Sequence, residues 1–226
     1  QFLQKHCTEK LHVKHIIDHV THVNPAENND IASISTKKNG EISGDLFIDC
    51  TGSAAILLAK HYKIPFISKK QVLFNDSALA VHVPYSNDNS PIASFTHSTA
   101  QTAGWIWDIG LPTRKGVGYV YSSSHSNDNQ AEQVLRDYLT ANGTSNESIS
   151  MLEPRKLNIN PGYHAKCWQN NCIAIGMAAG FIEPLEASAL ALIEWTASTL
   201  AQQLPPNRQV MDTIAERVNL RYQQHW

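Results

Sequence analysis

The chain has 226 residues, of which 42% are hydrophobic and 17% charged, and its formal net charge is −2 at pH 7. This composition excludes a disordered chain, a coiled coil and a collagen, and a chain of this size buries roughly 70% of the surface that its unfolded form exposes. The Lys and Arg residues are scattered along the sequence, so the basic stripe of a nucleic-acid binder is missing and no nucleic-acid partner is expected.

Cysteine usage and apolar stretches indicate a cytoplasmic protein without membrane contact. Four irregularly spaced cysteines (7, 50, 167 and 172) are too few for a secreted disulfide scaffold, so we expect reduced thiols. The longest mainly apolar stretch, 173–182, is far shorter than the roughly 20 residues that cross a bilayer. The first residues include neither a methionine nor a signal peptide, which indicates a piece of a longer chain.

The first 70 residues are expected to form a short helix, a hairpin and a βα unit. The hairpin joins an extended run over 13–23 to a strand over 31–35. The apolar run 45–50 predicts a central strand that is covered on both faces. Thr51-Gly52 permits a tight turn from this strand into a helix over 56–61.

Alternating β-branched and aromatic segments predict an antiparallel sheet between residues 74 and 123, with strands over 78–85, 92–100, 105–109 and 118–123. A crossover helix is expected from Asp128 or Asn129 to Ala141, where Asn142-Gly143 ends it. The Gly116-Val117-Gly118 segment lacks the third glycine of a dinucleotide fingerprint and predicts a turn between strands. The buried run 172–175 before Gly176 predicts a second βα junction, followed by helices over 187–204 and 208–226.

Four histidines raise the question of a metal site. His12, His15, His19 and His22 are spaced three, four and three apart, which on a helix would form one stripe. Their β-branched neighbours favour a strand, on which the rings would point to both faces. The Cys167/Cys172 pair is a zinc half-site at most, so no metal is predicted.

Two further segments can carry chemistry. Trp105 and Trp107 would lie on one face of a strand, roughly 7 Å apart, either as core aromatics or as the wall of a cavity. In 176–190, small residues let backbone approach a bulky ligand, and the free N–H groups at the start of the following helix make an anion site. Glu183 and Glu186 lie beside this helix start, where they either take part in catalysis or only stabilise the first turn.

Five segments, taken in chain order, resemble the flavin-dependent tryptophan halogenase family. The most specific are the paired-tryptophan segment, which is similar to the family's W-x-W-x-I-P signature, and F-I-E-P-L-E. The match covers essentially the whole chain. The five segments are Glu9–Val13, Asp45–Gly52, Gly104–Ile109, Gly118–Ser123 and Phe181–Glu186.

The resemblance implies an α/β chain with part of a flavin monooxygenase-type FAD-binding fold, into which an antiparallel substrate-side sheet is inserted. Residues 1–70 and 161–226 would belong to the FAD-binding domain, the latter also starting a C-terminal helical region, and 71–160 would form the sheet with its helix. Family members use reduced FAD from a separate flavin reductase, with O2 and chloride or bromide, to halogenate tryptophan or another electron-rich aromatic compound. The family's glycine-rich fingerprint and lysine are not found in this sequence, so this chain alone is expected to be inactive.

Individual roles follow from the same resemblance. Glu186 is similar to the catalytic glutamate that orients substrate and oxidant, and the backbone of Ser188 and Ala189 is similar to the halide site. Trp105 and Trp107 resemble the barrier between flavin and substrate. Cofactor contacts are implied for Val20, Gly176, Met177, Ala178, Ala179 and Leu190.

Three departures accompany the match: Gly110 replaces the signature proline, Met177 replaces a polar residue, and Ala187-Ser188-Ala189 replaces Ser-Thr-Gly, so Ala189 lacks the conformational freedom of glycine. Substrates other than tryptophan (another indole, a pyrrole or a phenol), a homodimer, a related monooxygenase that hydroxylates, and an inactive fragment all stay open.

Overall fold

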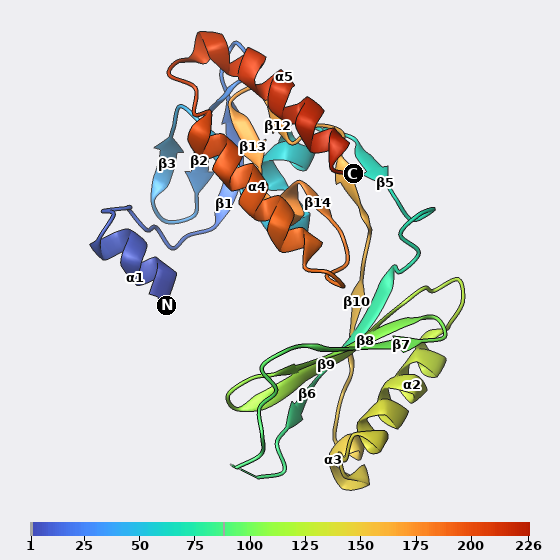
Figure 1. Ribbon diagram of the computed structural model, residues 1–226. Coiled ribbons are helices and arrows are strands. Elements are labelled where there is room, and N and C mark those ends of the chain that lie inside the picture. The colour runs from blue at the N-terminus through green and yellow to red at the C-terminus, as the bar shows by residue number, and fades with distance from the viewer. Residues whose placement is uncertain (1, 88) are drawn as a thin grey trace.

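The computed structural model describes residues 2–87 and 89–226 as a mixed α/β chain with several antiparallel sheets. Figure 1 shows the small sheets with the first helix and the last helices in an upper part, and the larger sheet with its own helices in a lower part. The segments that lead into β6 and out of β10 connect the two parts.

The N-terminal region contains the predicted helix and hairpin. After α1 (Phe2–Glu9), β1 (Val20–Pro25), β2 (Ile31–Thr36) and β3 (Gly40–Ser43) form an antiparallel sheet in the order β1-β2-β3. The expected extended run over 13–23 was too long, because strand pairing begins at Val20. The third strand, β3, was not predicted.

A short parallel pair forms the centre of the upper part. The strand β13 (Cys172–Ala174) lies between β12 (Trp168–Gln169) and β4 (Phe47–Asp49), and it runs parallel to β4. The prediction that 45–50 is a central strand covered on both faces was therefore wrong. Phe47 and Asp49 point inward, but Ile48 between them is 49% exposed, and β4 pairs only with β13 within the described residues. A third small sheet joins β14 (Gly180–Phe181), β11 (Gly162–His164) and β5 (Phe66–Ser68).

The turn after β4 leads into helical structure as predicted. A 3-10 turn, η1 (Gly52–Ala54), is followed by the π-helix η2 (Ile56–His61). The carboxylate of the buried Asp49 accepts the backbone N–H groups of Thr51 (3.0 Å), Leu57 (2.8 Å) and Leu58 (2.9 Å), and the hydroxyl of Thr51 (2.6 Å). The first N–H groups of a helix have no acceptor within the helix, and Asp49 accepts those of Leu57 and Leu58.

The predicted antiparallel sheet is present, with the strand order β10-β6-β9-β8-β7. Its strands are β6 (Ser77–Pro84), β7 (His97–Gln101), β8 (Gly104–Gly110), β9 (Arg114–Tyr121) and β10 (Arg155–Asn158). Residues 92–96 were wrongly predicted as strand. The predicted turn at Gly116-Val117-Gly118 was also wrong, because these residues lie inside β9 and pair with both β6 and β8.

The helix after this sheet is a crossover, as predicted. β9 and β10 both run antiparallel to β6, and α2 (Asp128–Ala141) and α3 (Asn146–Ser150) connect them. The N-cap of α2 is Asn127, one residue before the expected cap, and its side chain forms a capping box with Gln130. The buried side chains of α2 pack on the same face of the sheet as Ile106 and Tyr119.

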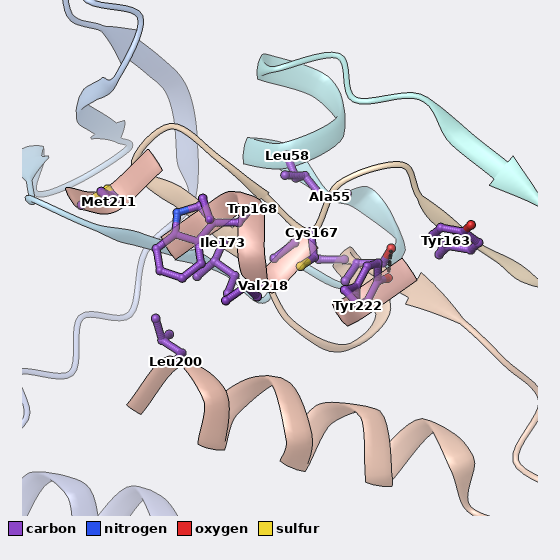
Figure 2. Close-up of a cluster of buried hydrophobic side chains, with 14 residues drawn as sticks. Ala55, Leu58, Tyr163, Cys167, Trp168, Ile173, Leu200, Met211, Val218 and Tyr222 are labelled. Atoms are coloured by element: carbon purple, nitrogen blue, oxygen red, sulfur yellow. Dashed lines mark hydrogen bonds between the residues drawn. The ribbon is translucent and has the colours of Figure 1, made fainter. Parts of the chain in front are cut away.

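Two helices close the upper part. α4 (Ser188–Gln202) and α5 (Arg208–Gln224) lie on either side of Pro205-Pro206. Figure 2 shows the core that they cover, in which Leu200 of α4 and Val218 of α5 pack with Trp168 and Ile173. Asn219 of α5 anchors β12, because its Oδ1 accepts the N–H groups of Cys167 and Trp168 at 2.9 Å. None of the described helices is long and apolar enough to cross a membrane.

Candidate functional site

The two tryptophans of β8 lie on the sheet face opposite α2. Trp105 packs with Ala78 and Val120, whereas Ile106 between the two tryptophans faces α2. The ring centroids of Trp105 and Trp107 are 6.2 Å apart, close to the expected spacing. Trp105 is only 7% exposed, and Trp107 is half-buried.

Gly118 makes room for this aromatic pair. A Cβ atom at Gly118 would lie 2.2 Å from ring carbons of Trp107 and 2.6 Å from the carbonyl oxygen of Leu79. A side chain at this position would therefore displace the ring of Trp107. The sequence signal was the Gly-Val-Gly segment, but we interpreted it as a turn.

A glutamate from the segment before α4 contacts the same tryptophan pair. Oε2 of Glu183 accepts hydrogen bonds from Nε1 of Trp105 (3.2 Å) and from Nδ2 of Asn75 (2.7 Å). Glu183 was predicted to lie beside a helix start, where it either takes part in catalysis or stabilises the first turn, and Asn75 was not identified at all. No short-range pattern links these positions, which are 78 and 108 residues apart in the chain.

The start of α4 is the predicted anion site. Ala187, the N-cap, adopts a left-handed conformation (φ 56°) and makes no side-chain capping bond. The N–H groups of Leu190 and Ala191 bond to the carbonyl of Ala187, which leaves those of Ser188 and Ala189 at the positive end of a 15-residue helix. Ala189 lies inside α4 with an ordinary helical backbone. The residue with a positive φ at this helix start is Ala187.

An apolar surface lies beside this helix start. Met177 is 50% exposed and Leu190 is 68% exposed. Gly176 has a left-handed backbone (φ 68°), and a Cβ there would touch Ile193 at 3.5 Å, so η3 (Gly176–Ala178) packs closely on α4. Ala178 and Ala179 are buried beneath it. Small residues next to exposed apolar side chains and free N–H groups fit a planar ring system such as a flavin.

The remaining predicted cofactor residue lies in another hollow. Val20 lines a cavity of about 230 Å³ together with His22, Ile56, Lys60 and His61. Burial and the nearby His22 lower the pKa of His61. One side of this cavity is thus the π-helix that Asp49 caps. A larger cavity of about 760 Å³ surrounds the Asp30–Arg208 ion pair (2.6 Å), and none of the predicted site residues lines it.

The structure brings some predicted site residues together and leaves others apart. Trp105 and Trp107 form one cluster, which Glu183 links to the segment before α4. Glu186 lies in that segment but is exposed, and within the described part of the chain it makes no side-chain hydrogen bond. Val20 lies in the separate cavity between β1 and η2.

The histidines and cysteines that we considered as metal ligands do not form a metal site in the described residues. Across residues 2–87 and 89–226, no three His, Cys, Asp or Glu side chains are grouped so that they could hold a metal ion. All four cysteines are free, with Cys167 and Cys172 buried. Burial raises the pKa of Cys167 to about 12, as expected for thiols that only fill the core.

With this geometry established, comparison with known proteins decides the family. A family model described as tryptophan halogenase matches residues 1–226. The chain belongs to the tryptophan halogenase family. It is 37% identical to the tryptophan 6-halogenase SttH of Streptomyces toxytricini over 193 residues, which are 85% of the chain and 36% of that relative. It is 32% identical to the tryptophan 7-halogenase RebH of Lentzea aerocolonigenes over 204 residues, which are 90% of the chain and 37% of that relative.

Solved structures show the same similarity. The crystal structure of a tryptophan halogenase from Shewanella frigidimarina superposes with a TM-score of 0.93 at 70% identity, covering 100% of this chain and 42% of that one. The chain therefore spans well under half the length of the relatives that it matches. Its fold is that of flavin-dependent halogenases, as the sequence predicted.

Proposed function

We propose that the complete gene product is a flavin-dependent halogenase that uses reduced FAD, O2 and chloride or bromide to halogenate an electron-rich aromatic compound. One observation carries this proposal: the Trp105–Glu183 hydrogen bond joins the aromatic wall of the antiparallel sheet to the segment that leads into the anion site of α4. A tryptophan pair that is hydrogen-bonded to the segment leading into an anion site suits a reaction in which a halide and an aromatic substrate are brought together.

FAD would be held by two parts of this chain. Its ring system would lie on Gly176, Met177, Ala178, Ala179 and Leu190, and Val20 would lie against its adenine. When bound, FAD supplies the redox chemistry that activates oxygen. The fit rests on the exposed apolar side chains of Met177 and Leu190 beside small residues.

The chain's own residues would bind and orient the other reactants. The N–H groups of Ser188 and Ala189 would bind the halide, because helix N-termini favour anions. Glu186 would act as the catalytic residue that binds and orients the substrate, and its exposure in this chain leaves it open to a ligand. Trp105 and Trp107 would form the barrier between flavin and substrate.

The domain organisation belongs to the same proposal. Residues 1–70 and 161–226 would be parts of the FAD-binding domain, and 71–160 would be the substrate-side sheet. Tryptophan, another indole, a pyrrole or a phenol would be the substrate, and the relatives named above act on tryptophan. A cytoplasmic location, a separate flavin reductase and a homodimer complete the proposal.

Product analysis tests this function. The complete gene product would be supplied with FAD, a flavin reductase, O2 and a panel of aromatic compounds, in saturating bromide and without halide. A brominated product that requires bromide supports the proposal. A hydroxylated product that forms equally in both conditions would instead show a hydroxylating monooxygenase.

A further inference from the structure

Glu183 lies where the two parts of the chain meet. Its Oε2 atom accepts one hydrogen bond from Trp105 of β8 and one from Asn75, which precedes β6. Both donors come from the side of the antiparallel sheet, whereas Glu183 belongs to the segment between β14 and α4. A carboxylate acceptor makes such bonds stronger than a neutral acceptor does.

Both donors are themselves held in place. Trp105 is buried in β8, whose register with β9 pairs it with Val120. Asn75 is followed by Asp76, whose N–H bonds to the carbonyl of Tyr121 (3.1 Å) and whose carbonyl accepts the N–H of Ile159 (2.8 Å). The Asp76 carboxylate also accepts the N–H and the hydroxyl of Ser123, both at 2.8 Å. Trp105 is thus held within the sheet, and Asn75 is held through the bonds of its neighbour Asp76.

The segment that follows Glu183 has much weaker support of its own. Pro184, Leu185, Glu186 and Ala187 are exposed, and within the described ranges the backbone bond from Ala187 N–H to the Pro184 carbonyl, 3.2 Å long, only closes a local turn. This segment carries Glu186, and it ends at Ser188 and Ala189. The hydrogen bonds of Glu183 therefore determine where the 184–187 segment begins relative to the antiparallel sheet.

We propose that Glu183 is a positioning residue, which holds the Trp105 barrier and the Glu186–Ala189 segment in one arrangement. This inference rests on the proposed halogenase function. Glu183 does not touch a reactant; it acts through Trp105 and through the two residues, Pro184 and Leu185, that separate it from Glu186. Because both donors converge on a single oxygen, the amide oxygen of glutamine can accept both bonds, whereas leucine can accept neither.

The test compares Glu183→Gln and Glu183→Leu in the complete gene product, with Glu216→Leu as a control at an exposed position of α5. NMR of 15N-tryptophan-labelled protein reports the indole N–H of Trp105, which Trp105→Phe assigns. The halogenase assay reports kcat, KM and halogenated product per reduced flavin consumed.

We expect the leucine variant to shift the Trp105 indole signal, to speed its exchange with water, and to lower product per flavin about tenfold, since small misplacements of reacting groups are costly. KM for the aromatic substrate should stay constant, and Glu183→Gln should retain both the signal and the yield. The control should match wild type.

Two results would overturn the proposal: an unchanged Trp105 signal in Glu183→Leu, or a shifted signal with an unchanged product yield. A wild-type protein that makes no halogenated product would instead contradict the proposed function and with it the positioning role in catalysis. The NMR measurement would still show separately whether Glu183 holds Trp105.

Discussion

Trp107 occupies the space that a side chain at Gly118 would fill, with 2.2 Å between the ring and an added Cβ. The two residues pair across β8 and β9. The placement of the Trp107 ring therefore depends on a glycine of the neighbouring strand. The same strand contains Gly116, where an added Cβ would meet nothing within 4 Å.

This pair of glycines gives a matched test. Gly118→Ala should destabilise the protein by about 1–3 kcal/mol and displace Trp107, because the new methyl group overlaps the ring. Gly116→Ala should change stability by about 0.5 kcal/mol or less. Thermal unfolding and tryptophan fluorescence of the complete gene product measure both effects. Equal behaviour of the two variants would contradict the packing shown at Gly118.

Asp49 offers a second stability test. Asp49→Ala removes the acceptor of three backbone N–H groups and one hydroxyl. The N–H groups of the buried Leu57 and Leu58 would then be unpaired, which costs about 1–3 kcal/mol each. We expect a large fall in the unfolding midpoint, and a smaller one for Asp49→Asn, which keeps one acceptor oxygen. A midpoint that does not change in the alanine variant would show that Asp49 does not hold η2.

Two alanines at the start of α4 should respond to glycine with opposite signs. Ala187→Gly relieves a left-handed backbone (φ 56°), so it should stabilise the protein by up to about 1 kcal/mol. Ala189→Gly places glycine in a helical backbone and should destabilise it by about 0.5–1 kcal/mol. Denaturant unfolding of the two variants measures the difference, and destabilisation by Ala187→Gly would contradict the assigned N-cap conformation.

Thiol labelling should divide the cysteines into two classes. Cys50 is exposed, and partial desolvation of its thiol together with the nearby Asp49 carboxylate raises its pKa. Its labelling at pH 8 should therefore be slower than that of free cysteine and should accelerate as the pH rises, since the thiolate is the reactive form. Cys167 and Cys172 should react only after unfolding. Mass spectrometry of the modified peptides would reveal early modification of Cys167, which would contradict its burial.

The sequence predicted the parts of the fold that local patterns determine. The α2 and α4 helices, the β1-β2 hairpin and the antiparallel sheet each have a periodicity and end signals within one segment. The errors arose where residues far apart in the chain determine the pairing or the burial of a segment. The run 45–50 is apolar in composition, but its strand β4 lies at the edge of its sheet, where it pairs with β13, and Ile48 is exposed.

The candidate site shows the same difference. The start of α4 near Ser188 and the spacing of the tryptophans could be predicted, because helix starts and strand alternation are local. The Asn75–Glu183–Trp105 arrangement could not, since its three members come from separate elements that only the tertiary fold brings together. Gly118 was misinterpreted for the same reason: its function depends on a ring in the adjacent strand.

The most direct test of the account measures halogenated product from the complete gene product and from its Glu186→Gln variant, with flavin binding recorded for both. Glutamine keeps the volume of the side chain and removes the charge, so we expect product formation to fall at least about a hundredfold while flavin affinity stays unchanged. Halogenated product from the wild type and a near loss in the variant would support the assigned site. Equal product formation by both proteins would remove Glu186 from the mechanism and contradict the account.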